Sequence, residues 1–420
     1  GGLPPSVREV PPKAAEGVFA GKADEGCKKR FLFSGRSFLK SWATFFVGGD
    51  FLLGFYFHVP FCRGKCPYCD FYSLDGTPEG MDAYVAGVLA ALGPWGEKLR
   101  GREIATVYFG GGTPSLLGAE RLARLLQGVK DCFALAPGAE VTLEANPTQV
   151  DRAFFQGVRE AGFDRLSMGL QSANEEELRL LGRAHSPRQA ARAVEDARAA
   201  GFSNISLDLM LGLPGGSREK LGRSIDFAAG LGVEHISSYI LKVEPGTPFA
   251  RQGVEVPDDD AAAEQYLFAV EELAKRGYGQ YEISNFAKPG RESRHNLLYW
   301  RGEEYVGFGP GAHSFFGGRR FYYPRDLAGF LNGAGPVDDG PGGGFGEFAM
   351  VNLRLSRGLV REDCLARFGA QGGALFDRAR ERAKKYPARL VRGDGERIAF
   401  TPEGFLVSNA LLVELLGEEL

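Results

Sequence analysis

Cys62, Cys66 and Cys69 are three of the chain's six cysteines and lie within eight residues. The C-x3-C-x2-C spacing puts three thiols on one short loop. Thiolates are the usual ligands of iron–sulfur clusters, and a cubane held by three cysteines keeps one iron open to a substrate. The loop therefore predicts a substrate-binding 4Fe–4S cluster, with these cysteines as its metal ligands.

Two other kinds of site fit part of the same loop. A structural zinc site needs four ligands, usually as two separated pairs. The remaining cysteines are isolated: Cys27, Cys132 and Cys364. His58 could supply a fourth ligand. However, it alternates with Tyr56 in a strand-like run, which favours a place in the core or next to the metal ligands. The segment Cys66-Pro-Tyr-Cys69 also has the form of a thiol-exchange motif. The presence of Cys62, four residues earlier, argues against that interpretation.

Length, net charge and cysteine content indicate the class of protein that contains this loop. At 420 residues, the chain has room for one large domain and a smaller one. A net charge of −3 gives no reason to expect nucleic acid as a partner. Six cysteines, three of them in one loop, fit a reducing compartment, so we expect a cytoplasmic protein.

Residues 1–50 are expected to be an N-terminal extension. Residues 1–30 are rich in Pro, Gly, Ala and Lys without periodicity, which is typical of disorder. No apolar run in residues 31–57 reaches the ~18 residues that a membrane-spanning helix needs. Acidic residues such as Glu9 and Asp24 disfavour a transit peptide. The chain begins with Gly-Gly and not with Met, which indicates a fragment or an upstream extension.

Short apolar runs alternate with amphipathic stretches from residue 55 to about residue 290. The expected strands are 55–59, 105–109, 141–145, 165–170, 205–209, 235–241 and 281–283. The expected helices lie near 81–99, 119–133, 150–161, 187–200, 217–231 and 259–276. This alternation predicts an α/β fold with a parallel sheet, as a full or partial barrel over residues 51–290.

Polar or glycine-rich motifs follow most of these strands. In barrels of this type, chemistry gathers at the carboxyl ends of the strands. We therefore expect one mouth to collect the cysteine loop, Gly110-Gly-Gly-Thr113, Glu144, Gln171 and Asp208. The glycine run could also be a simple tight turn. The two carboxylates lie among apolar neighbours, where a buried charge needs a partner, such as a cation or hydroxyl of a ligand.

The sequence changes character after residue 285. Residues 291–340 are rich in aromatic residues, with His295 and His313 among them, and are expected to connect the barrel to a second domain. They could form a packed aromatic floor, or a surface for a flat aromatic ligand with a histidine available to iron. Gly333–Gly346 reads as a linker. Residues 341–420 are expected to form a small helical domain with a winged-helix-like β-wing near 397–401.

Several sequence motifs resemble those of the oxygen-independent coproporphyrinogen III oxidase family of radical S-adenosylmethionine (SAM) proteins, in the same order and at similar spacing. They are Phe57-His-Val-Pro-Phe-Cys62, Tyr108-Phe-Gly-Gly-Gly-Thr-Pro114, Glu144-Ala-Asn-Pro147, Ser167-Met-Gly-Leu-Gln171, Leu207-Asp-Leu-Met-Leu-Gly-Leu-Pro214 and Tyr281-Glu-Ile-Ser-Asn-Phe286. The resemblance implies a partial (β/α)6 barrel, a 4Fe–4S cluster and bound SAM. It implies that these residues line the SAM site: Tyr56, Tyr68, Gly111, Gly112, Thr113, Glu144, Gln171, Arg183 and Asp208.

The family contains oxidases, which decarboxylate coproporphyrinogen III, and haem chaperones, which bind haem and pass it to acceptor haem proteins. The oxidases carry a fourth cysteine two residues after the third, where this chain has Phe71. The segment 295–300 matches the H-N-x-x-Y-W motif of the chaperones, with His295, Asn296, Tyr299 and Trp300. The predicted function is therefore a haem chaperone, with the oxidase as the alternative.

The same resemblance implies what the protein contacts. His295 is the leading residue for haem contact, with Tyr299 and His313 as alternatives. The implied acceptors include respiratory haem proteins at the membrane, which would bring the chain into peripheral membrane contact without a spanning segment.

Overall fold

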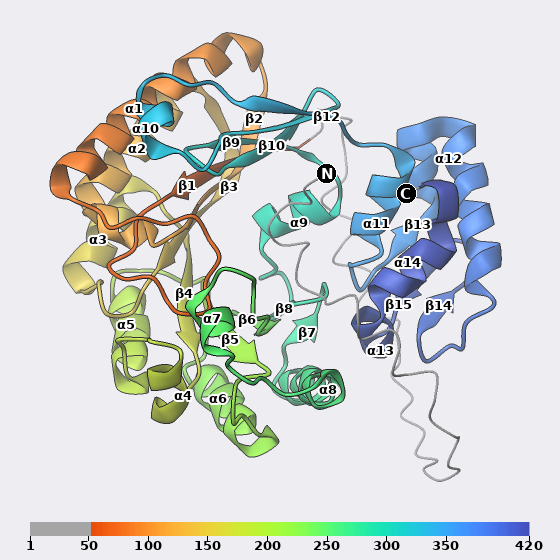
Figure 1. The fold of residues 1–420 in the computed structure, drawn as a ribbon. Coiled ribbons are helices and arrows are strands. Elements are labelled where there is room, and N and C mark those ends of the chain that lie inside the picture. Colours follow the sequence, from red (N-terminus) through yellow and green to blue (C-terminus); the bar gives the residue numbers. More distant parts are fainter. Residues whose placement is uncertain (1–51, 420) are drawn as a thin grey trace.

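The computed structural model describes residues 52–419, so the expected N-terminal extension at residues 1–50 lies outside the described residues. Six parallel strands, paired in chain order, form the centre of a twelve-stranded sheet (Figure 1). They are β1 (Leu53–Val59), β2 (Glu103–Gly111), β3 (Ala134–Ala145), β4 (Arg165–Gln171), β5 (Ile205–Leu211) and β6 (His235–Ile240). Their parallel pairing confirms the predicted α/β barrel.

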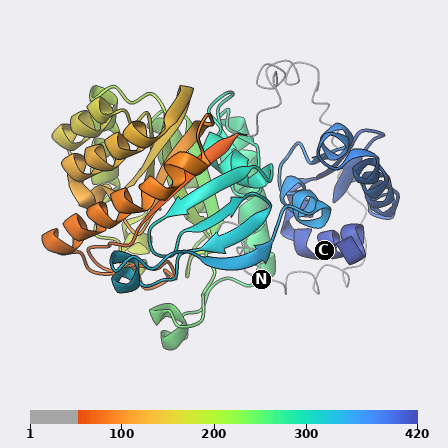
Figure 2. The same cartoon turned by 90° about the horizontal axis from the view of Figure 1, so that it is seen from above.

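Helices connect these strands and cover the outside of the sheet (Figures 1 and 2). They are α1 (Pro78–Lys98), the 3-10 helix η5 (Pro114–Leu117), α2 (Gly118–Cys132), α3 (Arg152–Ala161), α4 (Glu175–Leu180), α5 (Pro187–Ala199), α6 (Arg218–Gly230), α7 (Pro248–Gln252) and α8 (Asp259–Lys275). Several begin with a side-chain cap, and α5 carries a full capping box between Ser186 and Gln189. These local signals explain why the predicted helix bounds lie within three residues of the observed ones.

The alternation along β1 separates the core from the barrel interior. Phe55 and Phe57 are fully buried and contact other aromatic rings, including that of Phe308 at 5.2 and 5.1 Å. Tyr56 and His58 lie on the opposite face, since successive strand side chains point to opposite sides. The strand thus packs one face beneath helices and presents polar aromatic groups on the other.

The expected strand at 281–283 is wrong. Short strands β7 (Gly279–Gln280) and β8 (Asn285–Ala287) flank that segment instead, and β8 pairs antiparallel with β6. The backbone of residues 281–283 bonds elsewhere: Ile283 N–H donates to the Arg354 carbonyl, and the Tyr281 carbonyl accepts from Ser356 N–H. Tertiary pairing with the C-terminal part therefore overrides the local strand pattern.

Residues 291–340 extend the barrel sheet beyond β1. They contain α9 (Arg294–Trp300), β9 (Glu304–Phe308), β10 (His313–Phe316), β11 (Arg319–Tyr322), α10 (Leu327–Leu331) and most of β12 (Val337–Pro341). β9 is parallel to β1, and the next three strands are antiparallel. The expected linker Gly333–Gly346 is thus wrong, because it includes an edge strand whose exposed Val-Asp-Asp-Gly-Pro sequence carries no apolar signature.

The C-terminal residues form a separate three-stranded sheet with helices around it (Figures 1 and 2, blue). The elements are α11 (Phe345–Asn352), β13 (Leu359–Val360), α12 (Arg361–Ala383), β14 (Val391–Gly393), β15 (Arg397–Phe400), α13 (Pro402–Leu406), α14 (Ser408–Leu416) and the 3-10 helix η6 (Gly417–Glu419). This arrangement agrees with the expected helical, winged unit. None of the helices within residues 52–419 has the length and apolarity to cross a membrane.

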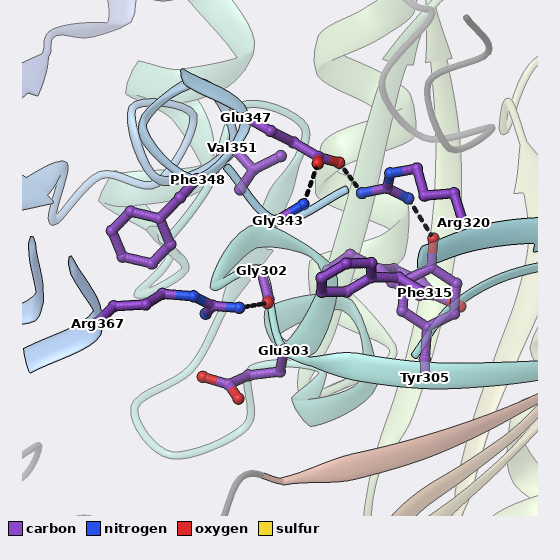
Figure 3. A pocket seen from close by; sticks show the side chains of 11 residues that line it. Gly302, Glu303, Tyr305, Phe315, Arg320, Gly343, Glu347, Phe348, Val351 and Arg367 are labelled. Atoms are coloured by element: carbon purple, nitrogen blue, oxygen red, sulfur yellow. Dashed lines mark hydrogen bonds and ion pairs between the residues drawn. The ribbon is translucent and has the colours of Figure 1, made fainter. Parts of the chain in front are cut away.

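A small cavity lies where the C-terminal helices meet α9, β9 and β10 (Figure 3). Arg367 donates to the Gly302 carbonyl at 2.6 Å, and Arg320 pairs with Glu347. The cavity has room for about one water molecule. This contact therefore joins the two parts tightly and leaves no room there for a large ligand.

Candidate functional site

The cysteine loop leaves the carboxyl end of β1 and is closed by backbone hydrogen bonds. Cys62 N–H donates to the Leu74 carbonyl at 2.9 Å, and Cys69 N–H donates to the Cys66 carbonyl at 3.1 Å. The three thiols are half-buried and none forms a disulfide. The Cys62 sulfur lies 3.5 Å from Thr113 Oγ1. The structure thus brings the predicted glycine-loop threonine against the first predicted ligand.

The glycine loop after β2 packs directly on the cysteine loop. Gly112 N–H donates to the Val59 carbonyl at 2.8 Å, and Thr113 N–H donates to the Phe61 carbonyl at 2.7 Å. A Cβ atom at Gly112 would lie 2.6 Å from the Phe61 carbonyl oxygen, and Gly111 has a φ of 110°. These glycines are required by close backbone approach and by backbone conformation.

Glu144 on β3 faces the mouth of the barrel. Its Oε1 accepts from Tyr108 Oη at 2.8 Å, and its Oε2 accepts from Gly111 N–H at 3.2 Å. Burial raises the pKa of this carboxyl to about 7; the hydrogen bond from Tyr108 opposes the increase, and the charge of Asp208 adds to it. A positively charged or hydroxyl-bearing ligand would therefore stabilise the ionised form.

Asp208 on β5 is the second carboxylate of this face. Ser167 Oγ donates to its Oδ1 at 3.3 Å. Burial raises the pKa of Asp208, whereas hydrogen bonds from Ser237 and Ser167 lower it. Arg165, the first residue of β4, is 2% exposed, and its charge lowers the pKa of both Glu144 and Asp208. A buried guanidinium thus balances two carboxylates within the barrel.

Arg183 connects the far side of the mouth to the cysteine loop. Its Nη2 donates to the Gly169 carbonyl at 3.0 Å, and its Nη1 donates to the Cys66 sulfur at 3.7 Å. Gln171, at the end of β4, has a φ of 66° and is the one non-glycine residue with a positive φ within residues 52–419. Such strained backbone is concentrated at functional sites.

Tyr68 lies within the cysteine loop and packs against α7. Its ring centroid is 6.2 Å from that of Phe249, and Phe249 N–H donates to the Pro67 carbonyl at 3.0 Å. Helix α7 therefore supports the loop from outside. Sequence reasoning missed this contact because α7 has only five residues.

His295 on α9 is 1% exposed and lies beneath the mouth, against the inner face of the sheet. Its ring is stacked on that of Tyr108 at a centroid distance of 5.0 Å. Hydrogen bonds join its Nδ1 to Thr106 Oγ1 at 2.7 Å and its Nε2 to Tyr299 Oη at 2.8 Å. Burial lowers the pKa of this imidazole to about 3. In this geometry neither nitrogen of His295 is open to an iron atom.

The remaining residues of the motif have different surroundings. Trp300 is 3% exposed, and Asn296 is half-buried, with its backbone N–H hydrogen-bonded to Ser293 Oγ at 3.4 Å. Tyr299 packs edge-on against Tyr305 at 4.5 Å, next to the small cavity of Figure 3. The motif thus links the barrel interior to the C-terminal part of the chain.

The chain is similar in sequence to known proteins. Residues 56–228 match the sequence profile of the Radical SAM superfamily. The chain is 42% identical over 380 residues to a protein named heme chaperone HemW from Mycobacterium tuberculosis, covering 87% of this chain and 95% of that protein. The chain belongs to the HemW family of radical SAM proteins. Heme chaperone HemW of Escherichia coli is also 42% identical, over 288 residues that cover 67% of this chain and 76% of that protein.

One solved structure has a similar fold. Coproporphyrinogen III oxidase (HemN) from Escherichia coli superposes with a TM-score of 0.76 at 20% identity, covering 88% of this chain and 91% of that chain. At this identity the likeness concerns the fold alone. The HemW relatives, in contrast, confirm the resemblance inferred from the sequence and its haem-chaperone branch.

Membership of this superfamily implies a 4Fe–4S cluster and SAM, and the cysteine loop fits a cluster chemically. Burial raises the pKa of the Cys69 thiol to about 11, and the thiols of Cys66 and Cys62 act in the same direction. Bound iron would offset this cost by pairing with the thiolates. No three His, Cys, Asp or Glu side chains of residues 52–419 converge on one metal position. A cubane does not need such convergence, since each cysteine binds a different iron.

Sequence reasoning missed two residues that organise this site, Tyr108 and Arg165. Tyr108 alternates with apolar neighbours on β2 and shares a face with Thr106, so strand alternation could have indicated its inward position. Arg165 gave no such signal, because an arginine at the start of a strand is ordinarily exposed.

Proposed function

We propose that this chain is a haem chaperone, which binds haem and transfers it to acceptor haem proteins. The observation that carries the proposal is the 42% identity to HemW over 95% of that protein. Two features of the sequence support it: the H-N-x-x-Y-W motif at 295–300, and Phe71 in the place of a fourth cysteine. We propose respiratory haem proteins as acceptors, and a cytoplasmic protein that meets them at the membrane surface.

We also propose that the barrel mouth binds the cluster and SAM. Cys62, Cys66 and Cys69 would hold the cluster, which supplies an open iron and one-electron reduction chemistry when bound. The chain's own residues then position SAM. Glu144 offers a carboxylate to its cationic or hydroxyl groups, and Arg183 carries a fixed positive charge next to Cys66.

The remaining predicted residues complete the proposed SAM site. Tyr56 hydrogen-bonds His58 Nδ1 through its Oη at 3.0 Å and lines the inner face. Gly111 and Gly112 bring peptide groups to the mouth, Gln171 adds a polar side chain at the end of β4, and Asp208 adds one in the middle of the neighbouring strand β5. In this arrangement His295 acts as a positioning residue, because it stacks on Tyr108, which in turn donates to Glu144.

Haem binding and porphyrinogen decarboxylation can be tested separately. The reconstituted full chain is titrated anaerobically with haemin, and haem transfer to an apo-haem protein is followed by absorbance. Stoichiometric binding followed by transfer is expected. In a parallel reaction with SAM, a reductant and coproporphyrinogen III, no protoporphyrinogen should form. Formation of protoporphyrinogen, or a failure to bind haem, would overturn the chaperone function.

The cluster assignment has its own test. Replacing Cys62 with Ala should abolish the 4Fe–4S absorbance and reduce the iron content. Replacing the exposed Cys132, which lies at the end of α2, is the matched control and should leave both unchanged. Retention of the cluster in the first variant would contradict the ligand assignment.

A further inference from the structure

Arg165, the first residue of β4, is a cation buried inside the barrel. The residue is 2% exposed despite its long, charged side chain. Its Nε is buried and has no hydrogen-bond partner within residues 52–419. Taking a guanidinium out of water is costly unless opposite charge lies near it. The charged groups around Arg165 therefore determine what this residue contributes.

The register of the sheet places Arg165 beneath two carboxylates. Arg165 pairs with Thr142 of β3, and two residues further along both strands Ser167 pairs with Glu144. Ser167 Oγ donates to Asp208 Oδ1 of β5 at 3.3 Å. Residues two apart on a strand share a face and are separated by about 7 Å. Arg165 thus lies one step below Glu144 and Asp208, on the face that lines the barrel.

Glu144 and Asp208 make each other's ionisation harder. Burial raises the pKa of both carboxyls, and the charge of Asp208 raises that of Glu144 further. Two carboxyls that share a buried site do not both ionise readily without a compensating cation. The charge of Arg165 lowers the pKa of both, and Arg183, which also donates to the Cys66 sulfur, lowers that of Asp208. Arg165 thus supplies positive charge to the pair.

We propose that Arg165 is a positioning residue for SAM: its buried charge keeps Glu144 and Asp208 ionised, so that they accept hydrogen bonds from cationic and hydroxyl groups of the ligand. The inference rests on the SAM site proposed above and adds a residue that acts through these two carboxylates. A neutral side chain in place of Arg165 would leave two buried carboxyls that hold protons near neutral pH. Protonated carboxyls offer a cationic ligand no charge with which to pair.

Two further buried carboxylates have partners of their own. Glu140, also on β3, accepts from the backbone N–H groups of Arg294 and His295 at 3.1 and 3.0 Å, at the start of α9. Burial lowers the pKa of Arg354 to about 10, and the charge of Glu282 opposes that decrease. Glu140 thus caps a helix, and Glu282 acts on an arginine of the C-terminal part.

The histidines and tyrosines that face Arg165 and the two carboxylates keep their charge between pH 6 and pH 9. Burial lowers the pKa of the histidines, to about 4 for His58, to about 3 for His295, and well below the usual value for His235. Burial raises the pKa of the tyrosines, which are Tyr56, Tyr108, Tyr281 and Tyr299. Arginine stays charged throughout this range. A change in SAM affinity with pH therefore reports on Glu144 and Asp208.

The pH dependence of SAM binding tests the role of Arg165. Isothermal titration calorimetry of the cluster-loaded full chain under anaerobic conditions gives the ratio of variant to wild-type affinity at each pH. The ratio is needed because the amine of SAM itself titrates in this range. Arg165→Met should bind SAM about tenfold more weakly at pH 6, because a nearby opposite charge favours ionisation of a carboxyl by at least that factor. The ratio should return toward one at pH 9, where the carboxyls ionise without a nearby cation.

Three other variants complete the comparison. Arg165→Lys keeps a positive charge and should bind SAM at pH 6 nearly as the wild type does. Arg165→Gln is a second neutral variant, with a polar end, and should repeat the pH dependence of Arg165→Met. Arg188→Met removes an exposed arginine of α5 and is the matched control, for which the ratio should stay at one throughout.

The outcomes separate this role from the SAM site itself. A wild type that binds no SAM would overturn the proposed site. Wild-type binding with the same weakening of Arg165→Met at every pH would overturn only the role of Arg165, since the side chain would then support the fold alone. Wild-type affinity in both neutral variants at pH 6 would overturn that role as well.

Discussion

Glu144 should make the ligand-free protein less stable as the pH rises, and Glu144→Gln should remove that dependence. Burial raises the pKa of this carboxyl from its usual value near 4.5 to about 7. The folded state therefore holds the proton more tightly than the unfolded state. The stability of the wild type, relative to a variant with a neutral side chain at this position, is highest at pH values below the usual pKa. It falls as the pH rises through the folded-state pKa.

The magnitude follows from the two pKa values. Ionisation of Glu144 against burial costs about 3 kcal/mol at pH 8 but only about 1 kcal/mol at pH 5. These are upper values, because the half-buried carboxyl reaches the barrel mouth, where water screens its charge. Glutamine is neutral at both pH values and keeps an oxygen to accept from Tyr108, so the hydrogen bonds of the variant do not change with pH. The difference between the two pH values isolates the ionisation cost.

Thermal unfolding of the SAM-free, cluster-loaded protein measures this effect. The Glu144→Gln variant should gain stability over the wild type at pH 8, and most of that gain should disappear at pH 5. Glu195→Gln, on the exposed face of α5, is the control and should show no such change. A stability difference for Glu144→Gln that is the same at both pH values would refute the assignment of a destabilised carboxylate.

Two further substitutions test the packing and the hydrogen bonds of the site. Gly112→Ala should reduce both cluster content and SAM binding, because the added Cβ would lie 2.6 Å from the Phe61 carbonyl oxygen. Gly64→Ala is the control, because no atom lies within 4 Å of a Cβ added there. An equal loss in both variants would contradict this explanation. Tyr108→Phe should weaken equilibrium SAM binding about tenfold at neutral pH, with recovery at higher pH, because a hydrogen bond to a charged group contributes about 1.5–3 kcal/mol and Glu144 would otherwise stay protonated. Unchanged affinity in Tyr108→Phe would show that Glu144 does not contact SAM in its ionised form.

The barrel was predictable because its signals are local. Apolar strand runs, helix caps and amphipathic helices recur from residue 55 to residue 275, and each can be read from a short stretch of sequence. The predictions failed where contacts between residues far apart in the sequence determine the local structure. Residues 281–283 look like a strand, yet their backbone pairs with residues 354–356. The edge strand β12 has no apolar pattern, because both of its faces are largely exposed.

The candidate site shows the same division. Sequence alone indicated the three cysteines, the glycine loop and the carboxylates Glu144 and Asp208 as candidate site residues, because motif spacing and strand order predict that they meet at one mouth. It also determined the family, through many ordered motifs. Only the tertiary structure decided that Tyr108 holds Glu144, that Arg165 balances two carboxylates, and that Arg183 lies against Cys66.

His295 shows most clearly why the sequence was insufficient. The motif at 295–300 indicated His295 as the residue for haem, but the fold buries that ring and engages both of its nitrogens. The sequence determines which ligand types are present. The packing determines which of them a ligand can reach, because burial and hydrogen-bond partners are set by residues far apart in the chain.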